Sequence, residues 1–211
     1  MKDRKMSFYN RIVKRLFDVL ISFVSIVILA IPMAIVALAI KIDSPGPVLF
    51  KQERIGKNGK IFTVYKFRSM CIGAEKTGSG VYSNKNDARV TRVGKFIRGT
   101  SIDELPQLFN MFLGSMSLIG PRPPLTYHPW TYAEYTEKQK EMFDVRPGLT
   151  GWAQIHGRKD LEWHKRIELN VWYARNVSFW LDLKIFFITI AKVLTNADNE
   201  NVNQTVEKSD G

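Results

Sequence analysis

The sequence predicts an α+β protein whose N-terminal helix lies in a membrane. Residues 19–40 form a run of 22 positions without a charged side chain, and short alternating segments typical of strands follow a Pro-Gly break. The 211-residue chain is 45% hydrophobic and 24% charged, so a packed core is possible and a wholly disordered protein is excluded. A single cysteine, Cys71, excludes a disulfide framework and a cysteine-rich zinc site.

The charge of the chain is unevenly distributed. The formal net charge is +11, and residues 1–100 hold 19 basic and 6 acidic side chains, whereas residues 101–211 hold 12 and 14. The excess positive charge therefore lies in the same half of the chain as the long apolar run. This combination indicates a membrane surface or a polyanionic substrate as the partner.

The apolar run is long enough to cross a bilayer, but its flanks leave the topology open. As a helix it would measure about 33 Å, against about 30 Å for the hydrocarbon core. No small-residue cleavage site follows it, so we expect it to stay in the mature protein. Both flanks are basic, which favours the cytoplasmic side for each, and Pro32 would kink the helix. A re-entrant helix that enters and leaves by one face and a straight span both remain possible.

The remainder of the chain reads as a small mixed domain. Residues 44–47 (Ser-Pro-Gly-Pro) break the helix and mark a boundary, so we divide the chain into residues 1–43, 44–195 and 196–211. The last of these segments is polar and is predicted to be disordered. The expected elements are strands at 48–53 and 61–67 joined by a hairpin turn at 56–60, a mobile loop at 73–88, helices at 89–98, 101–112 and 130–141, and an interfacial amphipathic helix at 179–194.

Two adjacent carboxylates, Asp103 and Glu104, begin the predicted helix 101–112. One interpretation is structural, because Ser101 with Glu104 three residues later matches a capping box. The other is chemical: Asp103 would be a nucleophile and Glu104 an acid/base or metal-orienting partner. A carboxylate pair near basic residues can also hold Mg²⁺, which favours carboxylates together with substrate phosphates.

Two arginines are held by prolines. Arg122 lies in the Gly-Pro-Arg-Pro-Pro segment 120–124, and Arg146 begins the segment Arg-Pro-Gly-Leu-Thr-Gly-Trp-Ala-Gln, 146–154. An arginine on stiff backbone loses little entropy when it binds phosphate oxygens in a bidentate manner. Taken singly, each segment is more often only a rigid connector or a turn. The three histidines show no metal-ligand spacing.

The chain resembles a known family over about residues 10–195, the bacterial sugar transferases, and among them the small monotopic phosphoglycosyl transferases. The motifs that carry the resemblance occur in one order, at 14–18 (Lys-Arg-Leu-Phe-Asp), 65–70 (Tyr-Lys-Phe-Arg-Ser-Met), 101–110 (Ser-Ile-Asp-Glu-Leu-Pro-Gln-Leu-Phe-Asn), 120–123 and 146–154. Five such motifs together favour the chemical interpretation of Asp103, Glu104, Arg122 and Arg146.

The resemblance implies a monotopic enzyme on the cytoplasmic face of the bacterial plasma membrane, with a kinked re-entrant helix, interfacial helices and a small α/β catalytic domain. It implies transfer of a sugar 1-phosphate from a UDP-sugar to undecaprenyl phosphate with release of UMP, the first membrane step of capsule, exopolysaccharide, O-antigen or glycoprotein synthesis. Asp103 matches the nucleophile that forms a phosphosugar-aspartyl intermediate, and Asp103 and Glu104 lie by the required Mg²⁺. The substrate phosphate-binding residues would be Arg122, Arg146, Lys66 and Arg68, and the substrate-binding loop residues Pro121, Pro147, Gly148 and Gln154.

One departure from the family pattern concerns the helix break, which is commonly Ser-Pro and here is Ile31-Pro32. Further expected partners are a second copy of the chain and downstream glycosyltransferases.

Two functions from other classes are the alternatives to this enzyme. A membrane-anchored nucleic-acid-binding protein would suit the basic charge. However, the sequence contains no nucleic-acid recognition motif, and acidic side chains offset the basic ones in residues 101–211. A non-catalytic scaffold for glycan enzymes would not need the Asp103–Glu104 pair.

Overall fold

The computed structural model describes residues 8–77, 87–157 and 161–195. Its α-helices are α1 (Lys14–Asp43), α2 (Arg92–Gly99), α3 (Gln107–Leu113), α4 (Glu137–Lys140), α5 (Trp152–Ile155), α6 (Trp163–Asn176) and α7 (Phe179–Leu194). Its strands are β1 (Leu49–Ile55), β2 (Ile61–Phe67), β3 (Ser117–Ile119) and β4 (Gly148–Thr150). Single helical turns of other types lie at Tyr9–Val13, Lys57–Gly59, Ala74–Lys76, Ile102–Glu104, Tyr132–Glu134 and Glu141–Asp144. The predicted tail at 196–211 and the centre of the predicted loop 73–88 lie outside the described residues.

Helix α1 has one polar, buried stripe and one broad apolar, exposed face. Lys14, Asp18 and Ser22 follow at four-residue spacing, so they share one face, and all three are buried against the rest of the molecule. The other side exposes large apolar side chains, among them Leu16, Leu20, Val27, Ile31 and Ile35. Within the described residues, the continuous helix 9–43 is the one that is long and apolar enough to cross a membrane.

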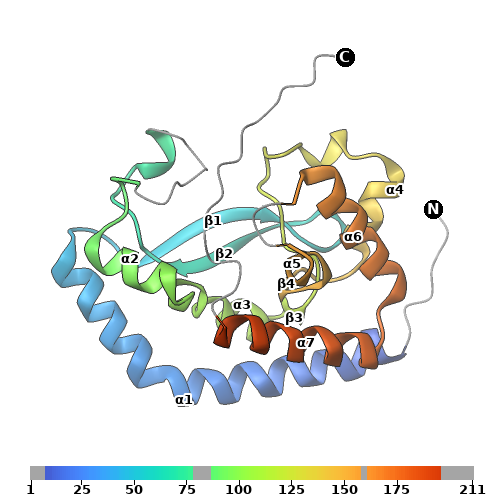
Figure 1. The fold of residues 1–211 in the computed structure, drawn as a ribbon, viewed down its shortest axis with the longest axis horizontal. Coiled ribbons are helices and arrows are strands. Elements are labelled where there is room, and N and C mark those ends of the chain that lie inside the picture. Colours follow the sequence, from blue (N-terminus) through green and yellow to red (C-terminus); the bar gives the residue numbers. More distant parts are fainter. Residues whose placement is uncertain (1–7, 78–86, 158–160, 196–211) are drawn as a thin grey trace.

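The course of α1 is bent rather than straight. Figure 1 shows its first half along the lower edge of the molecule and its last part turning up toward α2. Pro32 lies inside this helix, and proline is a common cause of such bends because it lacks an amide donor. Ser44, extended in conformation, ends α1 directly before the Pro-Gly-Pro break. The bend is compatible with a monotopic arrangement.

The β1–β2 hairpin crosses the molecule above α1, with α2 and α3 between them (Figure 1). The side chain of Asn110 on α3 joins the edge of β2 as another strand would. Its Oδ1 accepts from the amide of Tyr65 at 3.0 Å, and its Nδ2 donates to the carbonyl of Thr63 at 2.7 Å. This pair of hydrogen bonds fixes α3, and the residues just before it, in register with the hairpin.

The second strand pair was not expected from the sequence. Strands β3 and β4 lie parallel, with Ser117 opposite Gly148 and Ile119 opposite Thr150. Their glycines permit very close backbone contact, because a Cβ on Gly148 would lie 2.1 Å from the amide nitrogen of Gly120. The pair thus brings the loops that contain the two proline-held arginines side by side.

Several predicted elements are confirmed and others are wrong. The strand 61–67 and the helix 179–194 have the predicted bounds, while β1 ends two residues later than predicted and α2 begins at Arg92. The predicted helix 101–112 is a 3-10 turn followed by α3, and the capping box at Ser101 is wrong, since this residue has a φ of 59° and its side chain makes no cap. The predicted polar helix 130–141 is instead a series of short turns, each restarted by a threonine cap.

Candidate active site

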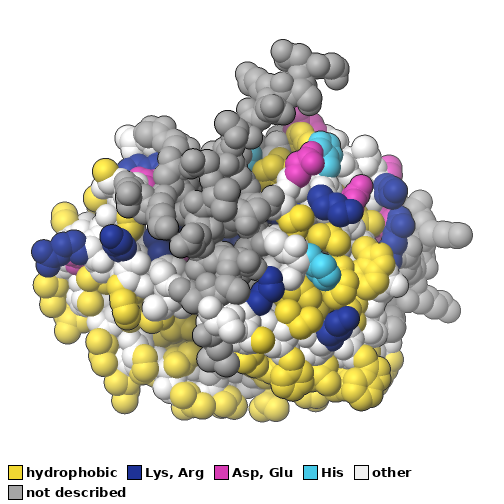
Figure 2. Space-filling model, in the orientation of Figure 1, with side chains coloured by type: hydrophobic (Ala, Val, Ile, Leu, Met, Phe, Trp, Pro, Cys, Tyr) yellow, Lys and Arg dark blue, Asp and Glu magenta, His cyan; other side chains and the backbone are white. Residues whose placement is uncertain are grey.

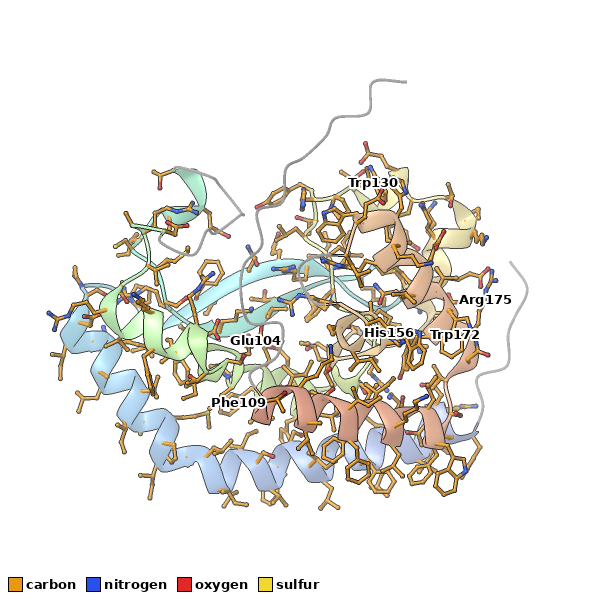
Figure 3. The ribbon with its side chains drawn as sticks, in the orientation of Figure 1. Glu104, Phe109, Trp130, His156, Trp172 and Arg175 are labelled. Atoms are coloured by element: carbon orange, nitrogen blue, oxygen red, sulfur yellow. The ribbon has the colours of Figure 1, made fainter. Side chains whose placement is uncertain are left out.

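The predicted acid pair lies in the 3-10 turn Ile102–Glu104, between α2 and α3 and against β2. Figure 3 shows Glu104 near the centre of the molecule, close to the hairpin. Lys66, on β2, reaches it with its amine 2.7 Å from Glu104 Oε1, and Arg122 Nη2 lies 3.5 Å from the same oxygen. The structure therefore brings together three residues that are 18 or more positions apart in the chain.

The two carboxylates have different electrostatic environments. Burial raises the pKa of Glu104, but the charges of Lys66 and Arg122 and their hydrogen bonds outweigh burial and bring this pKa to about 2. Burial also raises the pKa of Asp103, with Glu104 adding to the rise, and here the charges of Lys66, Arg98 and Arg122 do not reverse it. Asp103 makes no hydrogen bond or ion pair with the described residues, so its oxygens remain available for chemistry.

The carboxylates fit a magnesium ion that is shared with a substrate. Both contacts of Glu104 go to Oε1, which leaves Oε2, like the carboxylate of Asp103, without a hydrogen bond from the described residues. These residues contain no group of three or more His, Cys, Asp or Glu that would form a complete metal cage. Magnesium characteristically takes one or two carboxylates and completes its shell with water and substrate phosphate, so two carboxylates suffice.

Arg122 lies on a proline-rich loop within reach of Glu104. Its side chain is 42% exposed, so it can still reach a ligand while it contacts Glu104. The loop borders a shallow pocket lined by Ile55, Gly56, Pro121, Arg122, Pro123 and Pro147. Arg122 both lines this pocket and lies 3.5 Å from Glu104, so it is suited to bind a phosphate that approaches the carboxylates.

Arg146 and Arg68 have other surroundings. The positive charge of Arg146 acts on Lys57, whose pKa is lowered by burial and then by this charge, and on Arg15 in α1. Arg68 is buried and donates to the Ser44 carbonyl at 2.7 Å and to the Pro45 carbonyl at 2.6 Å, at the end of α1. Among the described residues, Lys66 and Arg122 are thus the predicted phosphate ligands that contact the acid pair.

The predicted loop residues lie next to Arg122 in the backbone. The amide of Gly148 donates to the carbonyl of Pro121 at 2.9 Å, and Pro147 lines the same pocket as Arg122. Both amide atoms of Gln154 are buried without a hydrogen-bond partner in the described part of the chain. A buried amide without a partner is uncommon, which is compatible with a ligand or water that satisfies it.

Sequence reasoning missed Arg54, which lies on β1 close enough for its charge and that of Arg122 to interact. A signal was present. In a strand, alternate residues share a face, and Phe50, Gln52 and Arg54 alternate with the exposed Lys51 and Glu53. Two polar side chains on the half-buried face of a strand require partners. Here Gln52 bonds to Glu75 and Arg54, and Arg54 bonds to the carbonyl of Pro123 beside Arg122.

The structure joins a membrane-type helix to a small α/β unit in which a lysine and an arginine contact Glu104 beside Asp103, an arrangement compatible with a membrane-associated transferase of phosphorylated substrates. The comparison with known families agrees: residues 9–196 match the bacterial sugar transferase family, and the chain belongs to it.

Three relatives illustrate the range of this similarity. The chain is 45% identical to the uncharacterized sugar transferase EpsL of Bacillus subtilis (strain 168), over 95% of this chain and 96% of the relative. It is 42% identical to a UDP-glucose:undecaprenyl-phosphate glucose-1-phosphate transferase of Klebsiella pneumoniae, over 92% of this chain and 43% of the relative. It is 43% identical to a UDP-N-acetylgalactosamine-undecaprenyl-phosphate N-acetylgalactosaminephosphotransferase of Aeromonas hydrophila, over 87% of this chain and 44% of the relative. The chain therefore spans less than half the length of the two relatives with named substrates.

Proposed function

We propose that this protein transfers a sugar 1-phosphate from a UDP-sugar to undecaprenyl phosphate and releases UMP, as a step of bacterial polysaccharide or glycoconjugate synthesis. The names of relatives from Klebsiella and Aeromonas support the substrate classes. The observation that carries the proposal is the acid pair, in which Lys66 and Arg122 hold Glu104 as a carboxylate while Asp103 makes no hydrogen bond or ion pair with the described residues. The two relatives carry different sugars in their names, so we leave the sugar of this protein open.

The transfer would proceed in two displacements at one phosphorus. In the first, a carboxylate oxygen of Asp103 attacks the sugar-linked phosphorus of the UDP-sugar, and the bond from this phosphorus to the UMP oxygen breaks. In the second, an oxygen of undecaprenyl phosphate attacks the same phosphorus and the carboxylate of Asp103 leaves. The products are UMP and a lipid diphosphate sugar, and the free carboxylate is restored.

The residues around Asp103 oppose the repulsion between its carboxylate and the diphosphate. Arg122 and Lys66 supply positive charge at the site before the substrate arrives, which is the preorganised stabilisation that enzymes use for developing charge. Magnesium held by Asp103 and Glu104 would add positive charge against the phosphate oxygens. Glu104 stays ionised because its pKa of about 2 lies far below neutral pH.

The location follows from the substrates and from α1. UDP-sugars are cytoplasmic and undecaprenyl phosphate is a membrane lipid, so the site must face the cytoplasm at the plasma membrane. Figure 2 shows hydrophobic side chains along the lower edge of the molecule, where Figure 1 places α1 and α7. We infer that this edge enters the bilayer and that α1 is re-entrant.

The decisive experiment combines UMP release with detection of the covalent intermediate. Asp103→Asn retains the shape of the side chain but loses its nucleophilic carboxylate, so we expect UMP release to fall at least 10³-fold. Wild-type protein mixed with UDP-sugar alone should carry a phosphosugar adduct on the peptide that contains Asp103. The control is Glu137→Gln, at an 83% exposed side chain, which should behave as wild type. Near-normal UMP release by Asp103→Asn would exclude this mechanism.

A further inference from the structure

The guanidinium of Arg54 makes three hydrogen bonds, which go to two neighbours. Its Nε and Nη2 donate to Gln52 Oε1 at 3.1 and 2.5 Å, and its Nη1 donates to the carbonyl of Pro123 at 2.9 Å. Pro123 directly follows Arg122 in the chain. The side chain of Arg54 thus ties β1 to the loop that presents the phosphate-binding arginine.

The backbone at this end of β1 holds the same loop. The amide of Ile55 donates to the Pro124 carbonyl at 3.0 Å, and Arg54 forms an isolated β-bridge with Leu125. These contacts fix the residues that follow Pro123, while the contact from the Arg54 side chain fixes Pro123 itself. Because Pro121, Pro123 and Pro124 stiffen the loop, a restraint at Pro123 is transmitted to Arg122.

Gln52 sets the orientation of Arg54. Its Nε2 donates to Glu75 Oε1 at 2.5 Å, so its carbonyl oxygen points to the guanidinium and accepts two hydrogen bonds from it. The result is a chain of side-chain hydrogen bonds that runs from Glu75 through Gln52 and Arg54 to Pro123. The planar guanidinium of Arg54 can donate to Gln52 and to the Pro123 carbonyl at once, whereas the donors of a lysine amine all lie at one nitrogen.

The charge of Arg54 also interacts with the charges of Arg122 and Glu104 in the site. Burial, then the charge of Arg122, lowers its pKa to about 10, with Glu104 acting in the opposite direction. Arg54 therefore stays protonated at neutral pH, and its repulsion with Arg122 persists in the protein without substrate. An anion bound at Arg122 would relieve this repulsion, so the two guanidinium groups together favour a phosphate at this place.

We propose that Arg54, oriented by Gln52, is a positioning residue that holds the Pro121–Pro124 loop so that Arg122 meets the diphosphate of the nucleotide-sugar substrate. This inference rests on the proposed function and adds to it a residue of β1 that acts through Arg122. Its role requires the forked geometry of arginine, not the positive charge alone.

The test is a double-mutant cycle measured by UMP release. Arg54→Lys keeps the charge and loses the fork, so we expect kcat/KM for the UDP-sugar to fall at least tenfold, with a melting temperature close to that of wild type. In an Arg122→Ala background, Arg54→Lys should lower kcat/KM by less than threefold, because Arg54 acts through Arg122. The control is Arg92→Lys, at a 97% exposed side chain on α2, which should leave kcat/KM unchanged.

Each possible outcome either supports or overturns the positioning role of Arg54. Independent, multiplicative losses from Arg54→Lys and Arg122→Ala would overturn the positioning role, and so would wild-type activity of Arg54→Lys. If Arg54→Lys does not fold, Gln52→Leu decides instead, since it leaves Arg54 in place but removes the acceptor that orients it, and it should lower kcat/KM in the same direction. Wild-type protein that releases no UMP from any UDP-sugar would refute the proposed function itself, which is a different result from an active Arg54→Lys variant.

Discussion

The pair Asp103 and Glu104 shows how neighbouring residues of nearly equal chemistry acquire different roles. Glu104 projects to Lys66 and Arg122, and their charges and hydrogen bonds hold it ionised at any physiological pH. Asp103 is partly buried and has no hydrogen-bond partner among the described residues, so its carboxylate is less stabilised. This second environment suits a nucleophile, because hydrogen bonds and ion pairs that stabilise a carboxylate lower its reactivity.

At the same scale, His128 should make the stability of the fold depend on pH. Burial, with the charges of Arg54 and Arg166, lowers its pKa below the usual value of about 6.5. The unfolded chain then binds a proton at a higher pH than the folded protein, so the free energy of unfolding decreases as the pH falls below about 6.5. We expect wild type to lose more thermal stability than His128→Gln between pH 7.5 and 5.5. Equal pH dependence of the melting temperature in both proteins would contradict this.

At the scale of elements, prediction succeeds where the pattern is local. The hairpin follows from two alternating segments around a Gly-containing turn, and α7 follows from a long apolar run with a serine cap. The helix 101–112 could not be predicted correctly, because the left-handed conformation of Ser101 depends on packing around the site. The helix 130–141 could have been corrected, since Thr136 with Gln139 three residues later marks a new helix start.

The contact between α2 and the segment that follows β2 depends on a single glycine. A Cβ on Gly94 would lie 2.0 Å from the carbonyl oxygen of Ser69, a backbone atom that cannot move aside cheaply. We therefore expect Gly94→Ala to destabilise the protein by roughly 1–3 kcal/mol through overpacking. Gly99 in the same helix has open space around its Cβ position, so Gly99→Ala should be neutral or stabilising by up to about 1 kcal/mol. Thermal unfolding of Gly94→Ala and Gly99→Ala in the same detergent measures the difference. Equal effects of the two substitutions would show that the close contact of Gly94 with Ser69 does not matter for stability.

For the whole molecule, the central feature is the junction of α1 with α7. Lys14 pairs with Asp182 in the interior, and Asp182 also accepts hydrogen bonds from Tyr173 at 2.6 Å and from Tyr9 at 2.7 Å. The apolar length of α1 was predictable from composition, and the four-residue spacing of its polar side chains indicates a face that packs on protein. Its partner Asp182 lies 168 positions away, and such a pairing is a property of the tertiary structure.

The Lys14–Asp182 pair should respond strongly to the loss of one partner. Both side chains are less than 10% exposed, so Asp182→Asn would leave the buried ammonium of Lys14 without its nearest countercharge, with Asp18 as the charge that remains in its surroundings. We expect a loss of about 3–5 kcal/mol in stability, as is typical when one member of a buried pair is removed. The pair of the exposed Glu137 with the half-buried Lys140 offers the matched control, because Glu137→Gln should cost less than about 1 kcal/mol. Similar melting temperatures for the two variants would show that the buried pair does not hold α1 to α7.

The position of α1 in the membrane is the last property to be tested, and it can be tested with single cysteines. Residues 1–18 carry six basic and two acidic groups, and residues 41–70 carry seven and two, so either flank resists translocation. The last part of α1 turns up toward α2 in Figure 1, which is compatible with a helix that returns to the side from which it entered. If α1 is re-entrant, a cysteine at position 7 and the native, exposed Cys71 both face the cytoplasm.

We therefore expect an impermeant thiol reagent applied to intact spheroplasts to label neither Cys71 in wild type nor the new thiol of Ser7→Cys in a Cys71→Ser background. Both should react once the membrane is permeabilised. Pro32→Leu restores the missing amide donor and removes the cause of the bend, so it should straighten α1 and raise labelling at position 7 in intact spheroplasts. Labelling at position 7 without Pro32→Leu, while Cys71 stays protected, would mean that α1 spans the bilayer, with its six basic groups on the outer side despite their charge.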